Sequence, residues 1–158
     1  MRELMNSINV RPAEDNDAKD IFNWHNDELT RKMSHSMNTI DWASHLKWYI
    51  SAINSPNSCL LICYLTKTEE KVGIVRFTIQ NNLALTSINI APNMRGQGLA
   101  KLCLSNSISF FRGKYIKITE LEAEIKSNNW ASRRAFEEVG FVLNHTKDDV
   151  GYFTLSLS

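Results

Sequence analysis

The stretch NIAPNMRGQGLAKLCL, residues 89–104, joins the end of an apolar strand to a loop with two glycines and the start of a helix. Glycine adopts backbone conformations that other residues avoid, and the free N–H groups at a helix N-terminus attract negative charge. Residues 95–100 therefore predict an anion-binding loop between a strand and a helix. The loop alone leaves a plain helix start open as the alternative.

Two common nucleotide-binding motifs do not fit this loop. A dinucleotide-binding fingerprint lies in a βαβ unit, whereas the strand before this loop closes a run of three strands. A Walker loop needs Lys and then Ser or Thr after its last glycine, but Gly98 is followed by Leu99 and Ala100. The short R-x-x-G-x-A pattern that remains suits a pyrophosphate.

The apolar periodicity predicts seven strands and four helices in one domain that covers residues 1–158. Strands are expected at residues 8–13, 59–66, 71–79, 83–91, 118–125, 141–144 and 150–157. Helices are expected at residues 18–24, 40–53, 98–111 and 130–139. Short polar links between the second, third and fourth strands predict hairpins. The expected fold class is therefore mixed α/β (α+β), with a mostly antiparallel central sheet flanked by about four helices.

Composition limits the classes of function. The chain has 18 Lys and Arg against 17 Asp and Glu, so its net charge gives no reason to expect nucleic acid or a membrane as partner. The first residues lack the apolar core of a signal peptide, and the longest apolar run, residues 59–65, is too short to span a bilayer. A cytoplasmic protein is expected. Three cysteines in apolar contexts are expected to be reduced core residues, and the histidines lack the spacing of zinc ligands, so no metal is expected.

The loop and a second motif together resemble a known superfamily. The strand, the R-G-Q-G-L-A loop, the helix and strand that follow, and NNWASRRAFEEVGF at residues 128–141 are similar to the GNAT superfamily of acyl-CoA-dependent N-acetyltransferases. The two motifs occur in the family's order. The resemblance implies the GNAT fold, acetyl-CoA as co-substrate, and direct transfer of the acetyl group to a primary amine in a ternary complex.

The same resemblance implies which residues bind acetyl-CoA. The pyrophosphate is expected on the loop amides, and the pantetheine arm is expected beside the strand that precedes the loop. Asn129 and Ser132 match positions that flank the arm, although a helix cap and a packing residue are the alternatives for these two. The implied cofactor-binding residues are Ile88, Ile90, Arg95, Gly96, Gln97, Gly98, Leu99, Ala100, Asn129 and Ser132.

Acetyl transfer requires a neutral amine, a proton acceptor and stabilisation of the developing oxyanion. Glu120, Glu122 and Glu124 alternate along one expected strand and share a face, for which a solvated surface is the alternative interpretation. Glu124 is the expected base because it lies nearest the end of the strand, and Asn89 is the second expected catalytic residue. Phe136 stands where many family members have a tyrosine that protonates the leaving thiolate, and phenylalanine has no proton to donate.

Residues 22–50 carry the signal for the acceptor. Their W-x-N-D and H-L-x-W patterns resemble amino-sugar N-acetyltransferases of the pseudaminic-acid type, which implies a nucleotide-linked amino sugar as the small-molecule acceptor. The residues expected to border the acceptor are His25, Asn26, His45, Arg76 and Thr78. A half-exposed surface position is the alternative for His45. The helical spacing of four aromatic residues predicts that most belong to the core: Trp24, Trp42, Trp48 and Tyr49.

Two other functions stay open at this point. The S-R-R sequence at residues 132–134 resembles ribosomal-protein N-terminal acetylases, so a protein N-terminus is an alternative acceptor. A non-catalytic acyl-CoA sensor is the other, because Phe136 lacks a hydroxyl group. The basic residues Arg31, Lys32 and Arg76 favour the nucleotide sugar, since such side chains bind phosphate. Exposed strand edges near the C-terminus allow two subunits to pair, so a homodimer is one expected state.

Overall fold

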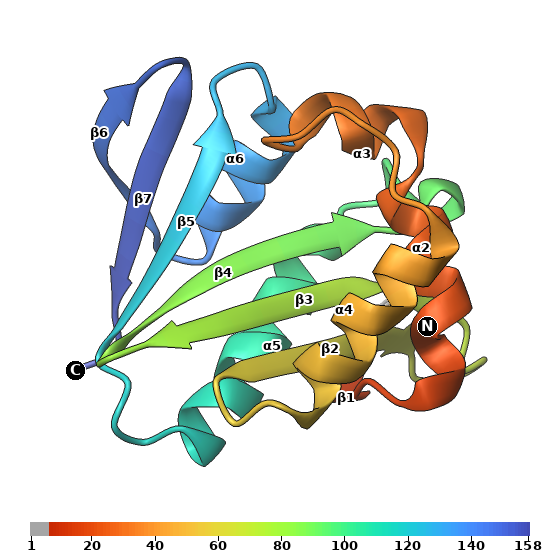
Figure 1. Ribbon diagram of the computed structural model, residues 1–158. Coiled ribbons are helices and arrows are strands. Elements are labelled where there is room, and N and C mark those ends of the chain that lie inside the picture. The colour runs from red at the N-terminus through yellow and green to blue at the C-terminus, as the bar shows by residue number, and fades with distance from the viewer. Residues whose placement is uncertain (1–6) are drawn as a thin grey trace.

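The computed structural model describes residues 7–158, and a seven-stranded sheet runs through it (Figure 1). The strands lie in the order β1-β2-β3-β4-β5-β7-β6, and every neighbouring pair is antiparallel except β4 and β5. Their bounds are Ile8–Pro12 (β1), Ser58–Leu65 (β2), Lys71–Gln80 (β3), Leu83–Ile90 (β4), Glu120–Lys126 (β5), Val142–Lys147 (β6) and Val150–Ser156 (β7). The expected mixed, mostly antiparallel sheet is confirmed.

Five α-helices and two short 3-10 helices complete the part of the chain that the structure describes. The α-helices are α2 (Ala18–His25), α3 (Glu28–Met33), α4 (Trp42–Asn54), α5 (Leu99–Lys114) and α6 (Trp130–Glu138), and the 3-10 helices are η1 (Asp15–Asp17) and η2 (Pro92–Met94). Four of the five match expected helices, whereas α3 is an addition. It buries none of its residues, so no apolar periodicity marks it in the sequence.

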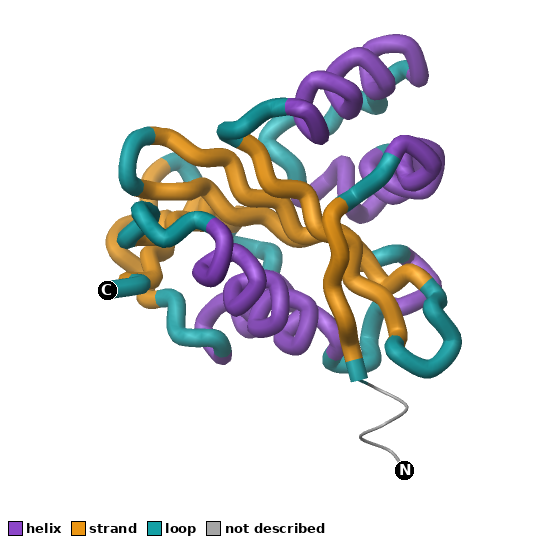
Figure 2. The backbone as a smooth tube through the Cα atoms, turned by 90° about the horizontal axis from the view of Figure 1, so that it is seen from below, coloured by secondary structure: helices purple, strands orange, loops and turns teal. Residues whose placement is uncertain are grey.

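Helices cover both faces of the sheet (Figure 2). On one face α4 packs on β2 and α2 lies against the end of β4, while α5 covers β1 to β4 from the other face and contacts α6. On the α5 face the rings of Phe77 and Phe111 stack 4.2 Å apart. All three cysteines are buried and free, as expected. Of the four aromatic residues expected mostly in the core, Trp24 and Tyr49 are buried and Trp48 packs against the core, whereas Trp42, the first residue of α4, is 39% exposed and contacts Phe22 edge-on.

The sheet opens between β4 and β5, and this opening positions the site. These two strands pair only through residues 83–85 and 120–122. Beyond that point β4 stays with β3 as far as Ile90, whereas β5 stays with β7 as far as Lys126. Because twisted sheets rotate successive strands, the two halves separate, and Figure 1 shows the resulting divergence. The backbone of residues 86–90 on the β5 side is therefore left without a strand partner.

A buried carboxylate ties the N-terminal segment to the sheet. Asp17, which precedes α2, contacts Arg11 and Lys71, each at 2.7 Å. Burial alone would raise the pKa of Asp17, but hydrogen bonds from Arg11 and Lys71 outweigh it and lower the pKa to about 2. Asp41 caps α4, since its carboxylate accepts a hydrogen bond from the Ser44 amide at 3.0 Å.

The far edge of the sheet is β6, whose six residues are all exposed. This edge is the one at which pairing between two copies was expected, and the homodimer stays a prediction. Within residues 7–158, no helix combines the length and the apolar character that a membrane crossing requires.

Candidate active site

A cavity of about 1070 Å³ lies where β4 and β5 diverge. Residues 86–90 of β4 and residues 124–126 of β5 form two of its walls, and the loop that leads into α5 forms a third. Side chains from α2, α3, α4 and α6 complete the lining. The volume exceeds that of a typical single-ligand pocket, so two substrates fit side by side.

The loop between β4 and α5 has the features of an anion site. Gly96 and Gly98 have φ angles of 75° and 72°, in the left-handed region that favours glycine. A Cβ atom on either glycine would meet nothing within 4 Å, so the space around the loop is open. No side chain caps α5, which leaves the amides of its first turn available to a ligand. The loop therefore fits a pyrophosphate group.

The loop residues differ in what they present to the cavity. Arg95, Gly96, Gly98, Leu99 and Ala100 line it, whereas the side chain of Gln97 is exposed outside the lining. The guanidinium of Arg95 turns toward α3, where its Nη1 lies 2.8 Å from Oδ2 of Asp27. The side chain of Gln97 therefore does not support its predicted role in cofactor binding. An anion bound to this loop would contact the backbone.

The expected binding strip for an extended cofactor arm lies beside this loop. Ile88 and Ile90 line the cavity, on the part of β4 that has no β5 partner. An extended ligand can pair with such free backbone groups as an added strand would. Asn129 and Ser132 also line the cavity, and Oδ1 of Asn129 accepts a hydrogen bond from the Ser132 amide at 3.2 Å. Asn129 is thus a helix cap at the cavity wall.

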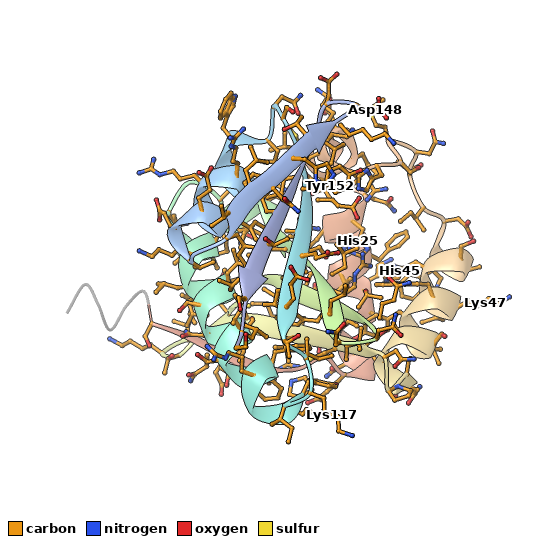
Figure 3. The ribbon with its side chains drawn as sticks, turned by 90° about the vertical axis from the view of Figure 1, so that its left-hand side faces the viewer. His25, His45, Lys47, Lys117, Asp148 and Tyr152 are labelled. Carbon is orange, nitrogen blue, oxygen red and sulfur yellow. The ribbon has the colours of Figure 1, made fainter. Side chains whose placement is uncertain are left out.

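Two histidines, Trp48 and Arg76 gather at the base of the cavity on the acceptor side. The rings of His25 and His45 lie side by side, 5.8 Å apart (Figure 3). The Arg76 guanidinium lies 5.3 Å from the centre of the Trp48 ring, which is 5.6 Å from that of His25. His45 is only 1% exposed, so the alternative of a half-exposed surface group is wrong.

Burial sets the charge states of the residues at the bottom of the cavity. It lowers the pKa of Arg76, and no neighbouring carboxylate counteracts this effect. Burial, together with the charge of Arg76, lowers the pKa of His25 to about 3, so this imidazole is neutral near pH 7. His45 donates from Nε2 to the Ala18 carbonyl at 2.9 Å, which leaves Nδ1 as an acceptor. The bottom of the cavity therefore offers one cation, Arg76, and two neutral imidazole rings.

Two residues expected at the acceptor do not line the cavity. Asn26 uses both ends of its amide on Ile40: Nδ2 donates to the carbonyl and Oδ1 accepts from the amide, each at 2.7 Å. Its role is to fold the connection between α3 and α4 back onto α2. Thr78 is exposed on β3 opposite Leu85, at the paired end of the β4–β5 junction and away from the gap. The structure does not bring Asn26 or Thr78 to the cavity.

The two expected catalytic residues lie on opposite sides of the gap. Asn89 on β4 and Glu124 on β5 both line the cavity. The parallel pair of Leu85 with Glu122 and the alternation along each strand put them on the same sheet face. Oε1 of Glu124 lies 3.2 Å from Nε2 of His35. Glu122, two positions earlier, does not line the cavity.

Several polar atoms in the wall have no partner in the protein. Nε of Arg31, Nδ1 of His45, Oγ1 of Thr86 and Nδ2 of Asn89 are buried without a hydrogen-bond partner among residues 7–158. All four residues line this one cavity. A buried polar group left unsatisfied costs about 1–3 kcal/mol, so the concentration of such groups here indicates a ligand site.

The sequence analysis missed the contribution of α3 and the loop after it. Thr30, Ser34 and His35 line the cavity, and none was singled out. The segment carries only polar and isolated apolar residues, so periodicity gave no signal. Among the described residues, no group of three or more His, Cys, Asp or Glu side chains is arranged to hold a metal ion.

Comparison with known proteins agrees with this geometry. The acetyltransferase (GNAT) domain family matches residues 7–142, and the chain therefore belongs to that family. No protein of curated function matches it in sequence.

Several solved structures share the fold at low sequence identity. A domain from Methanocaldococcus jannaschii DSM 2661 is 22% identical, with a TM-score of 0.82 over 95% of this chain and 98% of that one. Spermidine N-acetyltransferase from Vibrio cholerae, in complex with CoA and spermine, is 17% identical, with a TM-score of 0.82 over 95% of both chains. The aminoglycoside acetyltransferase AAC(6')-Ib, with ribostamycin and coenzyme A, is 14% identical, with a TM-score of 0.80 over 96% and 94%.

Family membership confirms the expected GNAT fold and the acetyltransferase class. The expected co-substrate, acetyl-CoA, agrees with the CoA and acetyl-CoA bound in similar structures.

Proposed function

We propose that this acetyltransferase acetylates the amino group of a small molecule that also carries negative charge, most specifically a nucleotide-linked amino sugar. The observation that carries the proposal is the partly buried Arg76 guanidinium, beside which no carboxylate lies at the floor of the cavity. Partial desolvation of a cation without a counter-charge costs free energy, and an anionic group on the acceptor would offset that cost.

The lining carries a net positive charge, which suits an anionic acceptor beside the phosphates of the donor. Six lining residues are Lys or Arg and two are Glu: Arg31, Arg76, Arg95, Lys101, Lys126 and Arg134 against Glu124 and Glu138. A polyamine or an aminoglycoside carries several positive charges and calls for carboxylates around it. The acceptor proposed here therefore differs in charge from spermine and ribostamycin, which the similar structures hold.

The neutral groups at the base suit sugar hydroxyls. Nδ1 of His45 is a free acceptor, buried without a partner in the protein. Hydroxyl groups both donate and accept, so they can satisfy such atoms. The Trp48 ring, partly buried beside Arg76, adds an apolar face on which a sugar or a base can stack.

The donor side is built from the backbone. The amides at the start of α5 and the free edge of β4 would hold acetyl-CoA, with Gly96 and Gly98 keeping the approach open. When bound, acetyl-CoA supplies an acetyl group activated as a thioester. These residues bind and orient the donor.

Glu124 is the proposed proton acceptor for the attacking amine. Its side chain is one-third exposed and contacts His35, so the proton has a path to solvent. The amine nitrogen forms the new C–N bond as the C–S bond breaks, and the proton that nitrogen loses passes to the Glu124 carboxylate. Phe136 has no ionisable proton to give to the thiolate, and it is 2% exposed and packs edge-on against Phe141.

The proposal is tested with one amino sugar in two forms. The ratio kcat/KM for acetylation is measured for the nucleotide-linked sugar and for the same sugar without its nucleotide. Recognition of the phosphates by Arg76 predicts a value at least about tenfold higher for the linked form, since a charge-assisted hydrogen bond contributes about 1.5–3 kcal/mol. Equal values for the two forms would overturn the proposal.

A further inference from the structure

A chain of polar contacts links the donor loop to β4 through α3. Arg95, in the loop, pairs with Asp27 and donates from Nη2 to Oγ1 of Thr30 at 3.0 Å. Oγ1 of Thr30 in turn donates to Oδ1 of Asn89 at 3.2 Å. Asp27 also caps α3 by accepting from the Thr30 amide at 3.3 Å. Three segments far apart in sequence thus meet at one hydroxyl group.

The Thr30 hydroxyl fixes the orientation of the Asn89 amide. The Thr30 hydroxyl oxygen accepts a hydrogen bond from Arg95, so the hydroxyl hydrogen is available to Asn89. Asn89 must therefore present its side-chain oxygen to this hydrogen. The amide nitrogen of Asn89 then points away from Thr30, and it is buried without a partner. Burial alone would raise the pKa of Asp27, but the hydrogen bond from Arg95 outweighs it and lowers this pKa, so the charge pair that anchors the arrangement persists.

Asn89 stands where donor and acceptor sides meet. It is the last but one residue of β4, on the strand segment that has no β5 partner, and it faces Glu124 across the gap. A donor N–H at this position is placed to bind an acyl carbonyl oxygen, where negative charge grows during transfer.

We infer that Thr30 is a positioning residue, which holds the Asn89 amide so that Nδ2 donates to the acyl carbonyl oxygen of acetyl-CoA. Arg95 couples this contact to the donor loop. The inference rests on the acetyl-CoA part of the proposed function and is independent of the acceptor's identity.

The test compares the binding of acetyl-CoA with that of CoA, which lacks the acyl carbonyl, by isothermal calorimetry. The preference for acetyl-CoA over CoA should fall about fivefold in Thr30→Val and in Asn89→Ala, as expected for one hydrogen bond. The double variant should show no further loss, because Thr30 acts only through Asn89. Thr30→Ser keeps the hydroxyl and should keep the preference.

Controls separate this role from a purely structural one. Thr78→Val removes an exposed hydroxyl outside the cavity and should leave the preference unchanged. The thermal midpoint reports folding, and α3 buries no residue, so Thr30→Val is expected to fold. An unchanged preference in Thr30→Val, or additive losses in the double variant, would overturn the inference. Since no acceptor is present, failure of the acceptor proposal leaves this outcome unaffected.

Discussion

Replacement of Arg76 by methionine is expected to raise stability and lower activity together. The guanidinium is partly buried beside Trp48, this burial lowers its pKa, and no carboxylate balances its charge. Methionine has a similar length and no charge, so Arg76→Met removes the desolvated cation while it keeps much of the packing. Replacement of a residue that only stabilises the fold would not raise stability while it lowers activity.

The two magnitudes follow from these contacts. Removal of a partly desolvated charge that has no counter-charge should stabilise the protein, less the roughly 0.5–1 kcal/mol of the contact between Arg76 and the ring. A net gain of about 1 kcal/mol raises Tm by about 2–4 °C in a chain of this length. Loss of one charge-assisted hydrogen bond to an acceptor phosphate should lower kcat/KM about 10- to 150-fold.

Differential scanning calorimetry and steady-state kinetics with a nucleotide-linked amino sugar measure the two effects. Arg76→Lys keeps the charge but loses the planar fork, and should fall between wild type and Arg76→Met in kcat/KM. Arg112→Met is the control, because Arg112 is exposed on α5 and bonds the Leu157 carbonyl at 2.9 Å. A lower Tm for Arg76→Met with unchanged kcat/KM would refute the reasoning.

Three further predictions concern the base, the donor loop and the fold. Glu124→Gln should lower kcat by a factor of about 10²–10⁴, most strongly at low pH, where fewer amines are neutral. Glu122→Gln is the control, because Glu122 lies outside the cavity. A pH–rate profile of Glu124→Gln that matches wild type would exclude Glu124 as the proton acceptor. Gly98→Ala should weaken acetyl-CoA binding in calorimetry, because alanine at a φ of 72° costs about 1–2 kcal/mol. The control Gly113→Ala should bind acetyl-CoA normally. Equal acetyl-CoA affinities of Gly98→Ala and wild type would contradict the loop assignment. Asp17→Asn should lose about 2 kcal/mol of stability at pH 7, since the folded pKa of about 2 lies below the ordinary value. The wild-type advantage is present above about pH 4 and should vanish as the pH falls through about 2, and parallel denaturation curves at all pH values would argue against it.

The sheet was predictable because its strands alternate cleanly and its turns are short. In β5 the buried residues Leu121, Ala123 and Ile125 alternate with Glu120, Glu122 and Glu124. The sequence also placed the anion loop, since two glycines before an apolar helix start are a local signal. Helix ends were less accurate: α5 continues through Gly113 to Lys114, because the chain around this exposed glycine needs no break.

The acceptor side was predicted less well because it depends on tertiary contacts. Nothing local shows that Asn26 turns back onto the Ile40 backbone or that α3, a polar six-residue helix, is held by Arg95 and Asn89. His45 illustrates the same limit: its helix position suggested a surface group, but α2 covers it and accepts its Nε2–H. Side-chain partners from distant segments decide each case.

The central claim is tested most directly by CoA release, read with a thiol reagent, from acetyl-CoA and a panel of amines. The panel contains nucleoside-diphosphate-linked amino sugars, spermidine, ribostamycin and peptides with free N-termini. The basic cavity predicts release with the nucleotide-linked amino sugars and a gain of one acetyl group on their amine. Release with spermidine, ribostamycin or peptides in place of these sugars, or no release with any amine, would contradict the account.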